Sequence, residues 1–211
     1  NNSKIIGNVY SNGSIFGLPG AEITGDTWVA GGTQPAPSTQ WTVTTSNFSF
    51  GKRVGGDDYL DIAQSFQTAT TGPINKVSLY IKKVGSPSNV TVQINRNSGS
   101  EPGKNANDVL TSGMLVASLV TANYGWVDVT FSSSPVLTAG TAYWLLIDTN
   151  RDDANYWVSG LDGADAYGYG VGKWSPNWNA GNPAWANAGG DFNFKIWMGG
   201  VETKIDNIDV G

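Results

Sequence analysis

The segment "INKVSLYIKKV", from Ile74 to Val84, decides the fold class of this chain. Its apolar residues Val77, Leu79 and Ile81 alternate with polar or amphipathic residues. Successive side chains of a β-strand point to opposite faces of the sheet, so this alternation predicts a strand with one buried face. The positions predicted to face outward are Lys76, Ser78 and Tyr80.

Similar short runs continue along the chain, separated by Gly, Pro, Asn and Ser. The run from Thr141 to Thr149, "TAYWLLIDT", is apolar on both faces and predicts a central strand. The one helical candidate, Ala106 to Val120, is interrupted by Gly113 and could equally be a strand. Closely spaced strands without helices between them predict an all-β antiparallel β-sandwich of the jelly-roll type. Other predicted strands lie at 41–50, 61–68, 90–96, 114–120, 125–133, 155–160 and 191–199.

The N-terminal region has a different pattern. "IIGNVYSNG" begins at Ile5 and "ITGDTWVAG" begins at Ile23, an offset of 18 residues. Two such copies fit either two coils of a β-solenoid or two β-hairpins. The C-terminal "TKIDNIDVG", from Thr203 to Gly211, resembles the first copy and favours the solenoid, with Ile205 joining an apolar row formed by Ile5 and Ile23.

These patterns divide the chain into four parts. We expect a solenoid-like segment at 1–33, a Pro-containing linker at 34–40, a β-sandwich at 41–199 and a resumed solenoid-like segment at 200–211. The sandwich is then an insertion whose two ends lie close together. The flanks are expected to stack with further repeats of the parent chain.

Composition excludes several classes of function. The chain has no Cys and no His, which excludes disulfides, thiolate metal sites and a Ser-His-Asp triad. The net charge is −5 without a basic face, so nucleic-acid binding is not expected. No apolar run is long enough to cross a bilayer, so we expect no membrane insertion within this segment. Few charges and many Gly, Asn, Ser and Thr residues are typical of extracellular β-proteins, and the lack of Cys favours a bacterial cell surface.

The order of strands and the motif "LTAGTAYWLLID" carry a family resemblance over about Trp41 to Met198. This region is similar to a jelly-roll-like module of bacterial secreted and surface proteins, which occurs in choice-of-anchor proteins and beside carbohydrate-active or adhesive domains. The flanks resemble the solenoid repeats of polymer-forming and pilus-associated surface proteins. Neither resemblance supplies a catalytic residue.

The acidic residues permit two interpretations. Several Asp pairs occur, but nothing marks two carboxylates as a glycosidase pair, so we expect no enzyme. Oxygen ligands without His or Cys suit Ca²⁺ rather than zinc. The resemblance implies a structural Ca²⁺ held by an early acidic loop and a late strand, while ordinary turn-forming aspartates remain the alternative. The matching positions are Asp57, Asp58, Asp61 and Asp191.

An aromatic-rich loop follows the predicted strand at 155–160. Trp and Tyr rings stack on the apolar faces of sugars, while Asn and Asp bind hydroxyl groups. The loop therefore predicts a carbohydrate-binding site. The alternative is that Trp174 and Trp185 cover the open end of the sandwich. The candidate ligand-binding residues are Trp174, Trp178, Trp185, Tyr167, Tyr169, Asn177, Asn179 and Asp165.

Two functions follow from these observations. The first is adhesion to a polysaccharide or cell-surface glycan, and the second is a spacer domain of a bacterial surface appendage without a ligand. Exposed Trp residues would favour the first function and buried Trp residues the second.

Overall fold

The computed structural model describes residues 4–7, 9–11, 21–23, 27–30, 36–199, 202–205 and 209–210. This part of the chain is all-β, and the sheets of the sandwich are antiparallel, as the alternating pattern predicted. Its one described helical element is a 3-10 turn, Ala117–Leu119, so the helical candidate at 106–120 is instead a strand followed by this turn. Among the described residues, no helix is long and apolar enough to span a membrane.

One sheet of the sandwich is organised around β10 (Gly72–Val84), the strand that decided the fold class. β10 pairs with β14 and β15 along one edge and with β21 and β17 along the other. The remaining bounds are β5 Thr39–Trp41, β6 Ser46–Phe50, β14 Gly125–Thr130, β15 Val136–Leu137, β17 Tyr156–Asp162, β20 Asp191–Phe192 and β21 Phe194–Met198.

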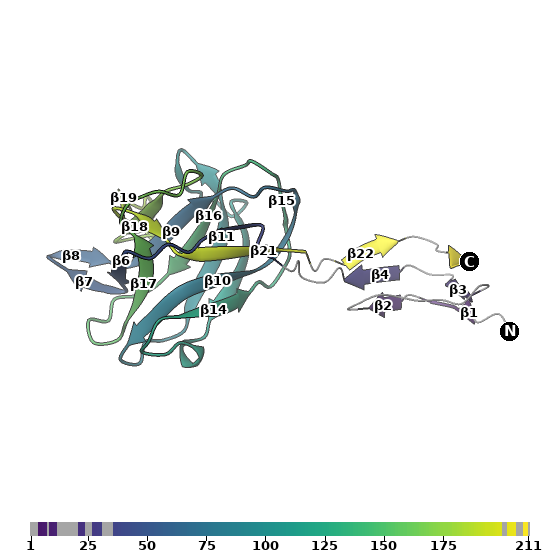
Figure 1. The fold of residues 1–211 in the computed structure, drawn as a ribbon, viewed down its shortest axis with the longest axis horizontal. Coiled ribbons are helices and arrows are strands. Elements are labelled where there is room, and N and C mark those ends of the chain that lie inside the picture. Colours follow the sequence, from purple (N-terminus) through teal and green to yellow (C-terminus); the bar gives the residue numbers. More distant parts are fainter. Residues whose placement is uncertain are drawn as a thin grey trace.

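The facing sheet has β16 (Tyr143–Asp148) at its centre, between β11 and β9. Figure 1 shows the two sheets packed against each other, with a separate hairpin of β7 and β8 at one end. The remaining bounds are β7 Lys52–Val54, β8 Asp57–Tyr59, β9 Asp61–Phe66, β11 Val90–Ser98, β12 Glu101–Pro102, β13 Val109–Leu115, β18 Gly172–Ser175 and β19 Ala186–Asn187.

The main core lies between these sheets. Val77, Leu79 and Ile81 of β10 are buried, as their alternation predicted, and they share the core with Leu145 and Ile147 of β16. Full burial of such a side chain stabilises the fold by about 1.5–3 kcal/mol. Because side chains alternate along a strand, burial of these three residues places the residues between them, including Tyr80, on the outer face of the sheet.

The flanking strands lie together beyond the end of the sandwich opposite the β7–β8 hairpin (Figure 1). β1 pairs in parallel with β3, with Ile5 opposite Ile23, and β2 pairs in parallel with β4. The predicted 18-residue offset is therefore the register of both parallel pairs. A salt bridge of 3.0 Å joins Lys4 to Glu22 across the first pair. The bounds are β1 Lys4–Ile5, β2 Val9–Ser11, β3 Ala21–Ile23 and β4 Thr27–Ala30.

The C-terminal strands β22 (Glu202–Ile205) and β23 (Asp209–Val210) run antiparallel to β4 and β3. Ile205 is opposite Thr27 rather than Ile23, so it is not the third member of the expected isoleucine row. The solenoid character of the flanks stays a prediction. The predicted linker at 34–40 lies partly outside the described residues, and β5 already pairs with β21 from Thr39 onward.

Candidate functional site

The predicted aromatic loop folds over the outer face of the sheet that contains β16. Trp144 and Leu146 of β16 point to that face, and the ring of Trp178 packs on them. Trp178 is only 4% exposed, and its ring centroid lies 5.8 Å from that of Trp185. The loop and the sheet thus form a second hydrophobic core, which explains why β16 is apolar on both faces.

The expectation that Trp178 presents a ring to a ligand is therefore wrong. Trp174 is half-buried, and its ring centroid lies 4.2 Å from that of Tyr59. Trp185 is half-buried beside Trp178. Tyr167 is also buried, and its hydroxyl group shares a hydrogen bond of 3.0 Å with Thr39. Trp178 and Trp185 therefore cover the outer face of β16, whereas Tyr167 and Trp174 pack against the main core between the sheets.

The other predicted ligand-binding residues do not form one site. Tyr169 is 65% exposed, and Asp165, Asn177 and Asn179 are also exposed. The Asn177 side chain accepts a hydrogen bond of 2.8 Å from the backbone of Ala184, and that of Asn179 donates one of 2.9 Å to Asp148. Both amides thus hold the loop in shape.

The four aspartates proposed as calcium ligands are distributed over different parts of the fold. Asp57 and Asp58 lie on the projecting hairpin, where Asp58 forms a salt bridge of 3.3 Å with Arg151. Asp191 is buried and accepts hydrogen bonds from Gln64 and from the backbone of Tyr167. Within the described ranges, no three acidic side chains are grouped as a metal ion would require.

We accordingly expect chelation of divalent cations to leave the melting temperature unchanged. A metal that bound only the folded protein would stabilise it, and its removal would lower the melting temperature. Thermal unfolding with and without EDTA measures this difference. A decrease that disappears in Asp57→Ala would contradict the expectation and support the calcium site.

Asp61 is the most perturbed of these carboxyl groups. It is 1% exposed and accepts hydrogen bonds of 2.9 Å from the Thr149 N–H and 3.0 Å from the Trp178 N–H. Its pKa is raised from 3.8 to about 7, chiefly by burial, which outweighs the two backbone hydrogen bonds that lower the pKa, with a smaller contribution from the nearby Asp148 in the raising direction. Asp61 therefore connects β9, the end of β16 and the aromatic loop in a structural role.

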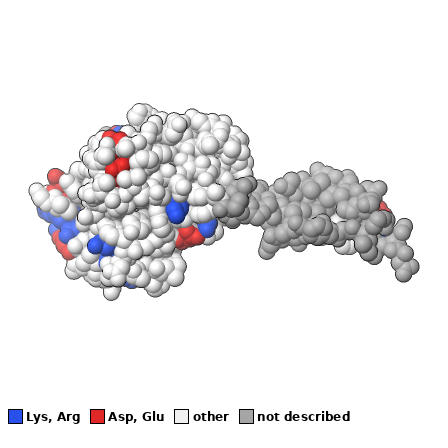
Figure 2. All heavy atoms as spheres, viewed as in Figure 1, with Lys and Arg blue, Asp and Glu red and all other residues white. Residues whose placement is uncertain are grey.

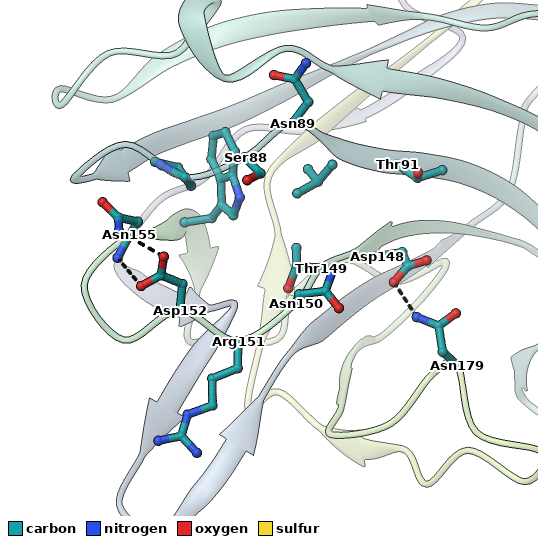
Figure 3. Close-up of a pocket in the computed structure, with 13 residues that line it drawn as sticks. Ser88, Asn89, Thr91, Asp148, Thr149, Asn150, Arg151, Asp152, Asn155 and Asn179 are labelled. Atoms are coloured by element: carbon teal, nitrogen blue, oxygen red, sulfur yellow. Dashed lines mark hydrogen bonds between the residues drawn. The ribbon is translucent and has the colours of Figure 1, made fainter.

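A polar pocket of ≈340 Å³ lies between the turn before β11 and the loop after β16 (Figure 3). Most of its charged groups are already bonded within the protein: Asp152 to Asn155, Asp148 to Asn179, and Arg151 to the nearby Asp153. The one Trp in its lining is 2% exposed and offers no free ring face. The pocket could accept a polyhydroxyl group, but these internal bonds account for its polar residues without a ligand.

A different surface combines the exposed ring of Trp126 and several partly buried rings with charge. It lies on the outer face of β10, β14 and β21, where Tyr80 is opposite Trp126 in the strand register. Trp126 is 37% exposed, and its ring centroid lies 5.2 Å from that of Tyr80. Figure 2 shows a few charged residues over these strands on an otherwise uncharged surface. We call this surface the aromatic–lysine face; its members are Tyr80, Tyr124, Trp126, Trp197, Lys76, Lys82, Lys195 and Asp128.

Hydrogen bonds fix one end of the aromatic–lysine face. The Trp197 indole N–H donates to Ser78 at 2.7 Å, Ser78 donates to Asp128 at 2.5 Å, and Lys76 donates to the same carboxylate at 2.6 Å. Partial burial would raise the pKa of Asp128, but the hydrogen bonds from Lys76 and Ser78 outweigh this effect and lower the pKa below 3.8. The carboxylate is thus ionised at neutral pH and fully paired.

The other rings of the face pack on one another. Tyr80 stacks with Tyr124, with 5.2 Å between the two ring centroids. A Cβ atom added to Gly160 would lie only 2.8 Å from the Tyr80 ring. The absence of a side chain at Gly160 therefore lets Tyr80 lie close to the sheet. The sequence contained a signal for this surface, because Tyr80 and Trp126 both occupy outward positions, but it did not show that their strands are neighbours.

The chain was compared with known protein families and with curated proteins. No family model matches it, and no curated protein matches it either. The assignment of a function therefore depends on the surfaces described above.

Proposed function

We propose that this protein is a non-enzymatic bacterial surface module that binds carbohydrate through the aromatic–lysine face. The observation that supports this proposal is the exposed Trp126 ring next to Tyr80, on a sheet surface that also carries hydrogen-bonding groups. A contiguous group of aromatic rings that reaches the surface is typical of an interaction site. The apolar face of a sugar ring is a suitable partner, because it can stack on the indole.

The expected affinity of one face is low. An aromatic stacking contact contributes about 0.5–1.5 kcal/mol beyond area burial. A millimolar Kd requires about 4 kcal/mol, so a face with few other contacts binds at millimolar concentrations or more weakly. A surface protein present in many copies can still adhere strongly, because multivalent attachment raises the effective affinity.

The test is retention on insoluble polysaccharides. Trp126→Ala is expected to lose retention and to keep its fold, because the side chain lies on the outer face of the sheet. Tyr169→Ala is the matched control, since it removes an exposed ring that lies outside the aromatic–lysine face. Retention that Trp126→Ala preserves and Tyr169→Ala removes would place the binding site elsewhere.

A structural role without a ligand is the second candidate. The burial of Trp178 favours it, because the Trp-rich loop is then explained as a cover for β16. If the wild-type protein is retained on no polysaccharide, the spacer function is the better interpretation.

A further inference from the structure

We infer that the ligand of the aromatic–lysine face is an acidic polysaccharide containing uronic acid units. This inference depends on the proposed carbohydrate-binding function and names its ligand class. Its basis is a local excess of positive charge on a protein whose net charge is −5. Strands β10, β14 and β21 contain four lysines and one acidic residue, Asp128.

The single carboxylate does not neutralise this face. Asp128 is paired with Lys76 at 2.6 Å. Lys82 and Lys195 form no salt bridge with any residue that the structure describes. The fourth lysine of these strands, Lys83, donates instead to the backbone of Ala117 at 2.7 Å. Two ammonium groups on the face thus remain available to an anionic ligand.

The two available ammonium groups stand directly beside the rings. Lys195 Nζ lies 4.1 Å from the Trp126 ring centroid, and Lys82 Nζ lies 4.7 Å from that of Tyr124. A neutral sugar that stacked on Trp126 would have to displace Lys195 and lose its cation–π contact. A uronic acid can stack while its carboxylate pairs with the same ammonium group. The arrangement therefore favours an acidic sugar over a neutral one.

The spacing of the lysines indicates a polymer rather than a single sugar. Lys195 is opposite Ser78 in the register, and Lys82 is further along β10. Position 82 is four residues beyond position 78, so their backbone positions lie about 13 Å apart along the strand. The two ammonium groups lie over different rings, Lys195 over Trp126 and Lys82 over Tyr124, and the Tyr80 ring centroid lies 5.2 Å from each of these rings. A single sugar unit would cover only part of this row. An extended chain with repeated carboxylates can cover the row and reach both ammonium groups.

The experiment compares polygalacturonate with its fully methyl-esterified form, which keeps the backbone and removes the charge. We expect the wild-type protein to bind the acid form more tightly than the ester, with a difference that decreases as salt concentration rises. Lys82→Gln/Lys195→Gln should weaken binding to the acid form about tenfold, since two ion pairs are lost together. It should not weaken binding to the ester, because a neutral sugar no longer has to displace Lys195 from the Trp126 ring. Affinity gels or calorimetry measure both ligands.

Arg96→Gln is the matched control, because it removes a positive charge from an exposed residue of β11 on the other sheet. Equal binding of the acid and the ester overturns the acidic-ligand inference and leaves the proposed function intact. Absence of binding to either form, together with no retention on neutral polysaccharides, overturns both. If single-stranded DNA binds as tightly as polygalacturonate, or if Arg96→Gln weakens binding to polygalacturonate as much as the double lysine variant does, the protein attracts polyanions in general. Either result also overturns the inference.

Discussion

The free energy of unfolding is expected to decrease as the pH rises from about 5 to about 7, and then to level off. Asp61 causes this dependence, because its pKa is about 7 in the folded protein and 3.8 in a solvated chain. Between these values the folded state holds a proton that the unfolded state has released, so raising the pH favours unfolding. The contribution of Asp61 is fully present below pH 4 and is lost above pH 7.

The expected change is large. The difference between pKa values of 3.8 and about 7 corresponds to roughly 4 kcal/mol over the whole range. For a domain of this size, that is a decrease in melting temperature of roughly 10 °C. The chain contains no His, the residue that most often titrates in this interval, so the transition should stand out clearly.

Thermal unfolding between pH 5 and pH 8.5 tests this prediction. Asp61→Asn should remove most of the slope, since the amide does not titrate, and should be less stable than the wild type at pH 5. Burial also raises the pKa of Asp191, which accounts for a smaller remaining slope of the same sign. The amide oxygen can accept a hydrogen bond from only one of the Thr149 and Trp178 N–H groups. Asp57→Asn, an exposed residue of the hairpin, is the control and should keep the wild-type profile. A flat wild-type profile, or a slope of undiminished size in Asp61→Asn, would contradict the role of Asp61.

The sandwich was predictable because its strands carry strong alternation. The inward set of β10 is buried as expected, and the two apolar faces of β16 correctly indicated a central strand. The 18-residue offset in the sequence also equals the register of the parallel pairs β1–β3 and β2–β4. Such local patterns are visible in sequence since side chains of a strand alternate between two faces.

The candidate site was less predictable because it depends on which strands are neighbours. Asp57 and Asp61 are close in sequence, but one lies on an exposed hairpin and the other is buried beneath the loop. Tyr80 and Trp126 are far apart in sequence and meet only through the pairing of β10 with β14. The loop has no periodicity, so its Trp residues could be assigned to solvent or to a core equally well. The two apolar faces of β16 were the available clue, because its second face had to be covered.

Trp178→Ala is expected to destabilise the protein by about 3–5 kcal/mol, the usual cost of truncating a buried Trp. The substitution removes a ring that packs on Trp144, Leu146 and Ala63, and it leaves a cavity between the loop and the sheet. Backbone contacts of Trp178 with Asp61 and Lys104 are expected to remain, so the loop cannot simply move away to relieve the loss. Urea denaturation measures the change in stability.

Trp126→Ala makes the same chemical change at a site that is 37% exposed, and it provides the matched comparison. Trp126→Ala should destabilise the protein by less than about 2 kcal/mol, because the Trp126 ring buries less apolar area than the Trp178 ring and its truncation therefore loses less burial. The two variants should therefore show opposite defects: Trp178→Ala loses stability, whereas Trp126→Ala loses polysaccharide retention. A stable Trp178→Ala variant that no longer binds polysaccharide would contradict this division and return the binding site to the aromatic loop.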